Sequence, residues 1–241
     1  MRNFFKNWAG KSIETTDSVK EKISEKEVNS TATDIIESSK WLPGETSFTH
    51  RVYKDYEEYI KHQASKLSKI NLESYDIKYR KTLVNRLTAL NILKQGDNVL
   101  CLGARIGTEC KAFIDLGCFA MGIDLNPGEN NYYVVHGDFH NLQFADVSVD
   151  YVFTNALDHV FHFEKVMAEI VRVLKPNGAF IAEIVGGTKD EHGREPGAYE
   201  SCWWETVEDV INKIIDSGFL VERRERFSYP WTGDQLIFRK P

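Results

Sequence analysis

Residues 98–109 read NVLCLGARIGTE, and residues 121–127 read MGIDLNP. The first segment is an apolar run, followed by a turn that contains Gly103 and Gly107, and then by the start of a helical pattern. The second segment is an apolar run that closes on the carboxylate of Asp124. Glycine permits backbone angles and close approaches that a Cβ forbids, so the chain can turn sharply from strand to helix. The two segments predict a strand–turn–helix–strand unit of an α/β fold.

The position of Asp124 indicates what this unit holds. Asp124 follows Gly103 by 21 residues, close to the ~20-residue interval at which an acid at the end of the second strand reaches ribose hydroxyls. A dinucleotide fingerprint G-x-G-x-x-G that starts at Gly103 also needs two further glycines, where this chain has Arg105 and Thr108. The pyrophosphate seat of a nicotinamide dehydrogenase is therefore missing.

The frame V-L-x-L-G-x-x-x-G resembles the first motif of the class I S-adenosylmethionine (SAM) methyltransferases. The matching positions are Val99, Leu100, Leu102, Gly103 and Gly107. Two positions depart from the motif. Cys101 stands where an acid is usual, and Arg105 replaces the usual middle glycine.

Later segments follow the order of the same family. A strand-like run at 132–135 precedes HGDFHNLQF, and DYVFTNALDHV predicts a fourth strand that ends near Asn155. An amphipathic helix within EIVRVLKPNGAFIAEIV then leads into a fifth strand. The resemblance covers about residues 80 to 240, and it implies a Rossmann-like fold with SAM as cofactor.

The pattern predicts an α/β fold class with a Rossmann-like, doubly wound sheet. We expect strands near 98–102, 119–123, 132–136, 149–153, 178–185, 218–226 and 234–239, and helices near 108–116, 163–174 and 205–217. Alternating strands and helices imply a mostly parallel sheet with helices on both faces. The last two strands are joined by YPWTG, which is too short for a crossover helix, so the last strand of the seven is expected to be antiparallel.

The chain divides into three expected parts. Residues 1–45 form a flexible or weakly helical lead, because residues 11–40 are rich in Ser, Thr, Glu and Lys and poor in aromatics. Residues 46–95 carry two apolar stripes at helical spacing and form an N-terminal helical cap. Residues 96–241 form the SAM-binding methyltransferase domain implied by the resemblance.

Composition and charge restrict the class of partner. The chain has 241 residues, of which 42% are hydrophobic, with a net charge of −6. This acidity argues against a nucleic-acid partner and favours a small-molecule acceptor. No apolar run approaches the ~20 residues of a membrane span, and residues 1–10 lack a signal-peptide core, so we expect a cytoplasmic protein with no membrane partner. The four cysteines form no CxxC pair and are expected to be reduced and structural.

The resemblance implies a set of cofactor-binding residues. Asp124 is expected to bind the ribose, and Asp138 to accept a hydrogen bond from the adenine amine beside Phe139; a turn-capping role is the alternative for Asp138. The Arg105 guanidinium is a candidate partner of the SAM carboxylate, with a solvated arginine as the alternative. The full expected set is Gly103, Ala104, Arg105, Gly107, Asp124, Leu125, Asp138, Phe139, Asn155 and Leu157.

Asp158 and His159 are the candidates for catalysis. Both follow the fourth predicted strand, at the carboxyl edge where open α/β sheets bind ligands. Imidazole titrates near neutrality, and a carboxylate can orient it and raise its pKa. A helix-capping Asp158 beside a packed His159 is the alternative. His136, His140 and His162 lack the spacing of metal ligands, so we expect no metal site.

The acceptor is the least defined part of the interpretation. No proline follows Asn155, so the Asn/Asp-Pro-Pro-aromatic run typical of methyltransferases acting on DNA bases is absent. Residues 186–204 combine loop composition with aromatic and polar side chains, which favours either acceptor binding or packing on the core. We expect a methyltransferase that acts on a small polar acceptor, for example a sugar or glycan precursor. The alternative is a SAM-binding scaffold or sensor without turnover.

Overall fold

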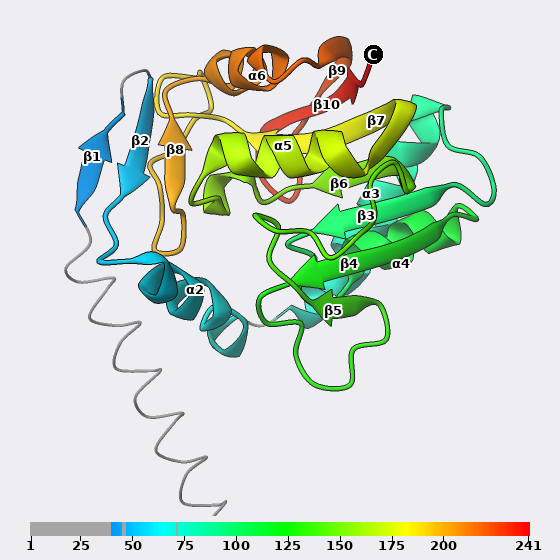
Figure 1. Ribbon diagram of the computed structural model, residues 1–241, viewed down its shortest axis with the longest axis horizontal. Helices are drawn as coiled ribbons and strands as arrows, with labels where there is room; N and C mark the ends of the chain where they lie inside the picture. Colours follow the sequence, from blue (N-terminus) through cyan, green and yellow to red (C-terminus); the bar gives the residue numbers. More distant parts are fainter. Residues whose placement is uncertain (1–39, 45–46, 71) are drawn as a thin grey trace, which may run out of the picture.

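The computed structural model describes residues 40–44, 47–70 and 72–241. Most of the lead expected at 1–45 lies outside these residues. The described part is built on a seven-stranded sheet in the order β5-β4-β3-β6-β7-β10-β9 (Figure 1). The strands are β3 (Asn98–Leu102), β4 (Phe119–Asp124), β5 (Val134–His136), β6 (Val149–Thr154), β7 (Leu174–Val185), β9 (Leu220–Phe227) and β10 (Gly233–Arg239).

The direction of the strands confirms the predicted fold class. β3, β4, β5, β6 and β7 pair in parallel. β10 lies between β7 and β9 and is antiparallel to both, with Gly233 opposite both Val185 and Phe227. The short connection between β9 and β10 imposes this hairpin, because a parallel pair needs a crossover of a dozen or more residues.

Helices cover both faces of the sheet. α3 (Glu73–Leu90) and α4 (Thr108–Asp115) lie on one face, and α5 (Phe163–Val173) and α6 (Val207–Asp216) lie on the other (Figure 1). Each face encloses its own apolar cluster. The N-cap residue of α6 is Thr206, whose side chain forms a capping box with Asp209, which satisfies free N–H groups of the first turn.

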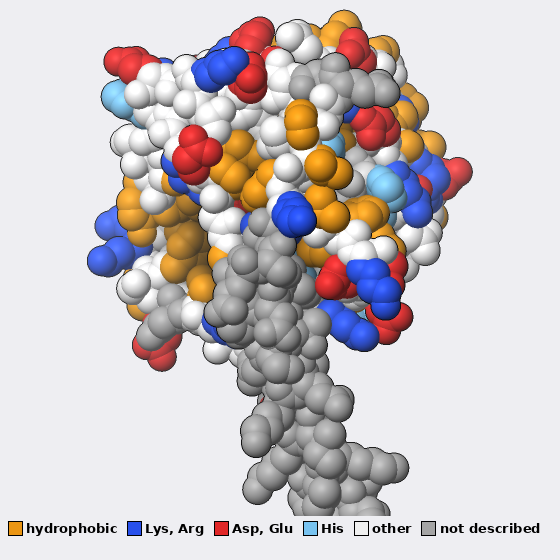
Figure 2. All heavy atoms as spheres, turned by 90° about the vertical axis from the view of Figure 1, so that its left-hand side faces the viewer, with side chains coloured by type: hydrophobic (Ala, Val, Ile, Leu, Met, Phe, Trp, Pro, Cys, Tyr) orange, Lys and Arg blue, Asp and Glu red, His pale blue; other side chains and the backbone are white. Residues whose placement is uncertain are grey.

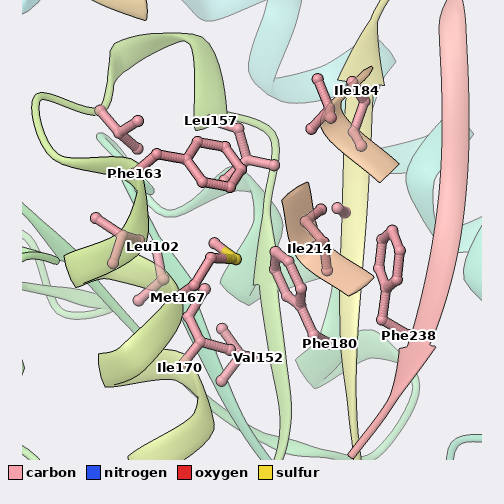
Figure 3. Close-up of a cluster of buried hydrophobic side chains, with 14 of the residues drawn as sticks. Leu102, Val152, Leu157, Phe163, Met167, Ile170, Phe180, Ile184, Ile214 and Phe238 are labelled. Atoms are coloured by element: carbon pink, nitrogen blue, oxygen red, sulfur yellow. The ribbon is translucent and has the colours of Figure 1, made fainter. Parts of the chain in front are cut away.

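The cluster under α5 and α6 is the larger part of the core. Figure 3 shows Met167 and Ile170 of α5 and Ile214 of α6 directed toward Phe180 and Phe238 of the sheet. The Phe180 and Phe238 rings stack with their centroids 5.8 Å apart. Burial of each large apolar side chain contributes about 1.5–3 kcal/mol, so this cluster fixes the sheet on which the site is built.

The N-terminal part is not purely helical, which corrects the expectation for residues 46–95. α2 (Tyr56–Ala64), a short 3-10 turn η1 (Leu67–Lys69) and α3 are present as expected. However, β2 (Phe48–Arg51) pairs antiparallel with β1 (Trp41–Pro43) and with β8 (Cys202–Trp204) in a second, three-stranded sheet. No local pattern predicts this sheet, because its strands are three or four residues long and β8 lies about 150 positions away from β2.

α2 and the small sheet lie at the carboxyl ends of β3, β4 and β6, on the left in Figure 1. Figure 2 views the molecule from this side and shows hydrophobic side chains near the centre, with charged side chains mainly around them. The Tyr59 hydroxyl of α2 donates to the His159 carbonyl at 3.1 Å. α2 is therefore fixed over the edge of the sheet at which ligands bind in open α/β folds. Within the described residues, no helix is long and apolar enough to cross a membrane.

Candidate functional site

Two adjoining pockets open at this edge. The first, here called the Asp124 pocket, lies between α2 and the ends of β3, β4 and β6. It is lined by Tyr59, Gln63, Lys66, Leu67, Gly103, Arg105, Asp124, Leu125, Asn126, Phe139, Ala156 and His159. The second, here called the Trp231 chamber, is lined by Lys66, Tyr75, Arg105, Asn155, Leu157, Asp158, His159, Glu183, Val185, Arg194, Glu200, Trp204 and Trp231. Lys66, Arg105 and His159 line both pockets and so mark their junction.

The turn after β3 forms the floor of the Asp124 pocket. Gly103 has a φ of 66°, and a Cβ at this position would lie 2.9 Å from the Ala156 Cβ. Ala104 is buried, and its N–H donates to the Ile123 carbonyl at 3.0 Å. Gly107 has a φ of 81° and precedes α4, and a Cβ at this position would lie 2.7 Å from the Tyr133 Cβ. Both glycines are thus required by close packing as well as by their backbone angles.

Asp124 ends β4 with its carboxylate held by the backbone. One carboxylate oxygen accepts from the Arg105 N–H at 2.9 Å, and the other accepts from the Asn126 N–H at 2.8 Å. Each oxygen of a carboxylate can accept a further hydrogen bond, so two adjacent hydroxyl donors can bind here. Burial raises the pKa of Asp124, and the two N–H groups oppose this effect by stabilising the charged form.

Arg105 carries a cation with free donors. Its backbone has a φ of 45°, and its guanidinium lies 5.4 Å from the centre of the Tyr75 ring. The backbone of Arg105 is hydrogen-bonded, but its guanidinium forms no hydrogen bond or ion pair with any residue that the structure describes. Burial lowers the pKa of Arg105, but the neighbouring Tyr75, Glu109 and Asp124 raise it above its ordinary value. The guanidinium therefore stays charged, with its planar set of donors available to an anionic group.

Several polar atoms of the chamber lack partners. The Tyr75 hydroxyl, the Asn155 Oδ1 and the Trp231 Nε1 are buried without a hydrogen bond among the described residues. The Asn155 amide donates to the Tyr79 hydroxyl at 2.9 Å and to the Glu109 carboxylate at 3.0 Å, which orients Oδ1. An unsatisfied buried polar group costs about 1–3 kcal/mol. These three atoms are therefore available to polar groups of a ligand in the chamber.

Glu183 of the chamber is held by side chains that lie behind the lining. Glu183 of β7 accepts from Arg86 at 2.6 Å, from the Tyr79 hydroxyl at 2.6 Å and from Gln235 at 2.9 Å. Burial raises the pKa of Glu183, and Arg86 opposes this effect. The sequence analysis missed Glu183, although a lone acid within the apolar run of a central strand is a signal that could have identified it.

An ion pair of the chamber lies in the loop before β8. Glu200 forms an ion pair with Arg194 at 2.8 Å, and the Arg194 guanidinium also lies 4.5 Å from the centre of the Trp203 ring. The two tryptophans of the aromatic pair in residues 186–204 have different surroundings. Trp204 lines the chamber and donates from Nε1 to the Val185 carbonyl at 2.9 Å, whereas Trp203 packs in the core.

Asp158 and His159 both face the pockets, but they do not form a hydrogen-bonded pair. They lie in the short turn η2 (Leu157–His159), and the His159 Nε2 is 3.8 Å from the Asp158 Oδ1. The His159 Nδ1 is 2.9 Å from the Tyr199 carbonyl, and its Nε2 is 2.7 Å from the Lys66 Nζ. The partner of the imidazole is thus a lysine that the sequence analysis did not select.

Asp138 and Phe139 follow β5 and take different places. Phe139 lines the Asp124 pocket. One Asp138 oxygen accepts from the Tyr56 hydroxyl at 2.5 Å, and the other is 2.8 Å from the His140 Nδ1. Burial alone would raise the pKa of Asp138, but these hydrogen bonds outweigh burial, so the pKa lies below its ordinary value. Asp138 therefore connects α2 to the sheet domain. Of the other expected residues, Leu125 lines the Asp124 pocket, while Asn155 and Leu157 line the chamber.

In the described part of the chain, no group of three or more His, Cys, Asp or Glu side chains is arranged to hold a metal ion. The residues present do fit SAM. Asp124 suits the two ribose hydroxyls, the free Arg105 guanidinium suits a carboxylate, and the unpartnered Asn155 Oδ1 suits an ammonium.

Comparisons with known proteins support this assignment. A family described as "Methyltransferase domain" matches residues 100–182. The sterol 24-C-methyltransferase of Schizosaccharomyces pombe is 35% identical over 104 residues, which are 36% of this chain and 28% of that protein. The sterol 24-C-methyltransferase of Eremothecium gossypii is 32% identical over 125 residues, which are 42% of this chain and 33% of that protein. The matches thus span about a third of each curated relative.

Solved structures share the fold. The 1,6-didemethyltoxoflavin-N1-methyltransferase of Burkholderia thailandensis, solved with its acceptor and S-adenosylhomocysteine, has a TM-score of 0.62 at 17% identity, over 83% of this chain and 99% of that chain. The Haloferax volcanii complex of the Trm112 methyltransferase activator with a methyltransferase has a TM-score of 0.61 at 17% identity, over 74% of this chain and 97% of the matched chain. Residues 100–182 thus match the methyltransferase domain family, and the strand order of the whole sheet agrees with a methyltransferase fold.

Proposed function

We propose that this chain transfers a methyl group from SAM to a small polar acceptor that binds in the Trp231 chamber. The observation that carries the proposal is the junction of two pockets. One pocket has a ribose-type carboxylate, the other has unpartnered polar atoms, and they share three ionisable side chains. When bound, SAM supplies a methyl group already activated on a sulfonium, so placement and deprotonation of the acceptor are the tasks left to the protein.

The proposed cofactor site uses the expected residues. Asp124 accepts from the ribose hydroxyls, and Phe139 borders the base. Arg105 pairs with the SAM carboxylate in a planar fork, which its free donors support. Asp138 remains a proposed acceptor for the adenine amine, although its present hydrogen bonds to Tyr56 and His140 must then be shared or exchanged.

The lining of the chamber favours an acceptor without net charge. Three carboxylates of the lining (Asp158, Glu183 and Glu200) are matched by three arginines, of which Arg105 and Arg194 line the chamber and Arg86 pairs with Glu183 from behind it. Burying an unbalanced charge costs far more than burying a hydrogen-bonded neutral group. Trp204 and Trp231 add flat apolar faces. This combination suits a sugar or glycan precursor, or another neutral ring with polar groups.

A sterol is the acceptor in the names of the two curated relatives, and it is a poor match for this chamber. The six charged side chains would lose water on contact with an apolar ring system and gain no partner. Support for the smaller, polar acceptor thus comes from the charged and polar lining of the chamber.

The first test is calorimetric titration of the full chain with S-adenosylhomocysteine, with NAD as the control ligand. We expect micromolar binding of S-adenosylhomocysteine alone. A panel of monosaccharides and small ring compounds is then incubated with SAM, and release of S-adenosylhomocysteine is measured. Binding without release across the panel would favour a non-catalytic SAM sensor instead, and lack of binding would refute the proposed function.

A further inference from the structure

We propose that Lys66 is the catalytic group that accepts the proton of the methyl acceptor, and that His159 positions it. This inference rests on the proposed function. It replaces the expected Asp158–His159 pair with a lysine–histidine pair that the fold assembles at the junction of the two pockets.

The placement of Lys66 satisfies the geometric requirement. Lys66 lies between α2 and η1, and its side chain reaches the junction, where it lines both the Asp124 pocket and the Trp231 chamber. A group that deprotonates the acceptor must reach the acceptor while the cofactor is bound beside it. Of the three junction residues, Arg105 cannot lose a proton in the accessible pH range, which leaves Lys66 and His159.

Both nitrogens of His159 are already engaged. Its Nδ1 lies 2.9 Å from the Tyr199 carbonyl, which can only accept, so Nδ1 carries the proton and donates. Its Nε2 is then the acceptor for the Lys66 Nζ at 2.7 Å. Burial lowers the pKa of His159, which keeps the ring neutral. His159 is therefore a fixed hydrogen-bond acceptor that orients Lys66, and it has no free nitrogen for the acceptor.

The surroundings of Lys66 make it lose its proton more easily than an exposed lysine does. No carboxylate lies within ion-pair distance of Nζ among the described residues, and its neighbours are the His159 ring and the Tyr199 ring, 5.6 Å away. Burial lowers the pKa of Lys66 to about 8, and Arg105 lowers it as well, whereas Asp158, Glu200 and Asp124 oppose this effect. A base with this proton affinity is suited to catalysis near neutral pH.

Neutral Lys66 has both the donor and the lone pair that the step needs. One N–H donates to the His159 Nε2, and the lone pair is left for the acceptor. The O–H bond of the acceptor breaks, and its electron pair forms the bond to the transferred methyl carbon. The C–S electron pair remains on the departing thioether. The proton binds to the Lys66 Nζ, and the resulting ammonium keeps its hydrogen bond to His159 until it returns the proton to solvent.

The protonation of Lys66 can be measured without turnover. The full chain is trace-labelled with acetic anhydride across about pH 6 to 10, and the peptide that carries Lys66 is quantified by mass spectrometry. Exposed Lys69 serves as the internal reference for the reagent. We expect half-maximal labelling of Lys66 near pH 8. A midpoint at the ordinary lysine value of about 10.4 would overturn the proposal, because the neutral fraction of Lys66 near pH 8 would then be far too small for a general base.

Measurement of kcat distinguishes a Lys66 that acts as a general base from a Lys66 that is needed only for its positive charge. With a monosaccharide or small alcohol that the wild-type chain methylates, Lys66→Met and Lys66→Arg should each lower kcat by roughly 100-fold or more, as loss of a general base does. Lys66→Arg keeps the positive charge, so recovery of activity in this variant would show that only charge matters. Asp158→Asn should lower kcat much less than the Lys66 variants do. A larger loss of kcat in Asp158→Asn than in Lys66→Met would assign the role of base to Asp158.

The outcomes also separate this inference from the proposed function. Absence of S-adenosylhomocysteine binding in the wild-type chain would refute both. Binding and turnover in the wild type, with equal turnover in Lys66→Met, would refute the role of Lys66 alone. Binding of S-adenosylhomocysteine without turnover of any hydroxyl acceptor in the panel would count against both the acceptor class and the proposed base.

Discussion

Replacement of Arg105 by alanine should weaken binding of S-adenosylhomocysteine and leave binding of 5′-methylthioadenosine nearly unchanged. The second ligand has the same adenosine and thioether but lacks the amino acid with its carboxylate. Arg105 has a guanidinium that contacts the Tyr75 ring and is otherwise unpaired within the described chain. The proposed contact therefore concerns the carboxylate alone, and comparison of the two ligands isolates it.

The magnitude follows from the kind of hydrogen bond that is lost. A hydrogen bond to a charged group contributes about 1.5–3 kcal/mol, and each 1.4 kcal/mol is a tenfold change in Kd. We therefore expect Kd for S-adenosylhomocysteine to rise by roughly 10- to 100-fold in Arg105→Ala. Arg105→Lys keeps the charge but not the planar fork, and it should fall between alanine and the wild type.

Arg105→Gly controls for the backbone. Arg105 has a φ of 45°, a conformation that glycine adopts without strain, and glycine is the usual residue of the family at this position. Calorimetry on all three variants with both ligands gives six affinities. Equal losses for the two ligands would mean that Arg105 acts only through the shape of the turn. An Arg105→Gly variant that binds S-adenosylhomocysteine as tightly as the wild type would refute the proposed pairing.

Three further predictions follow from other parts of the structure. Asp124→Asn should weaken binding of both adenosine ligands by about 1.5–3 kcal/mol, measured by calorimetry; unchanged affinity would contradict ribose binding at Asp124. His62 is buried, and burial lowers its pKa from 6.5 to about 4, so the unfolded chain binds a proton that the folded chain does not. The contribution of neutral His62 to the free energy of unfolding should be fully present above pH 6.5 and should be lost as the pH drops toward 4. His62→Phe should reduce this acid dependence in urea unfolding, and an identical pH profile in that variant would exclude His62 as its source. Phe180→Ala should lower the free energy of unfolding by about 3–5 kcal/mol, and a loss below about 1 kcal/mol would show that the core closes around the cavity.

The sheet could be predicted almost completely from the sequence. Every expected strand between 98 and 239 is present, with bounds that differ by a few residues. The largest difference is β7, which begins at Leu174 and includes the LKPNG segment that was expected to precede the strand. These elements are encoded locally, by apolar periodicity and by the turn residues between them, so a single sequence is enough to locate them.

The candidate site was predicted in part. The residues expected after β3, β4, β5 and β6 do lie at one edge, because the carboxyl ends of parallel strands meet there. The partner of His159 was missed, because Lys66 belongs to a different element more than 90 positions away. Tyr75 and Trp231 were also not predicted as polar groups of the chamber. Their hydroxyl and N–H become candidates only when the packing of the whole fold shows that they are buried without a partner.

The sequence by itself determined the fold class, the antiparallel pairing of the last two strands, and the positions of the glycines and of Asp124 in the proposed ribose site, because each depends on short-range pattern and spacing. Only the tertiary structure decided which charged groups meet at the junction of the two pockets. The pairing of Lys66 with His159, the burial of Glu183 among Tyr79, Arg86 and Gln235, and the small sheet of β1, β2 and β8 all join residues that are distant in sequence. Such contacts depend on how complete elements pack, and this information is not contained in any one segment of the chain.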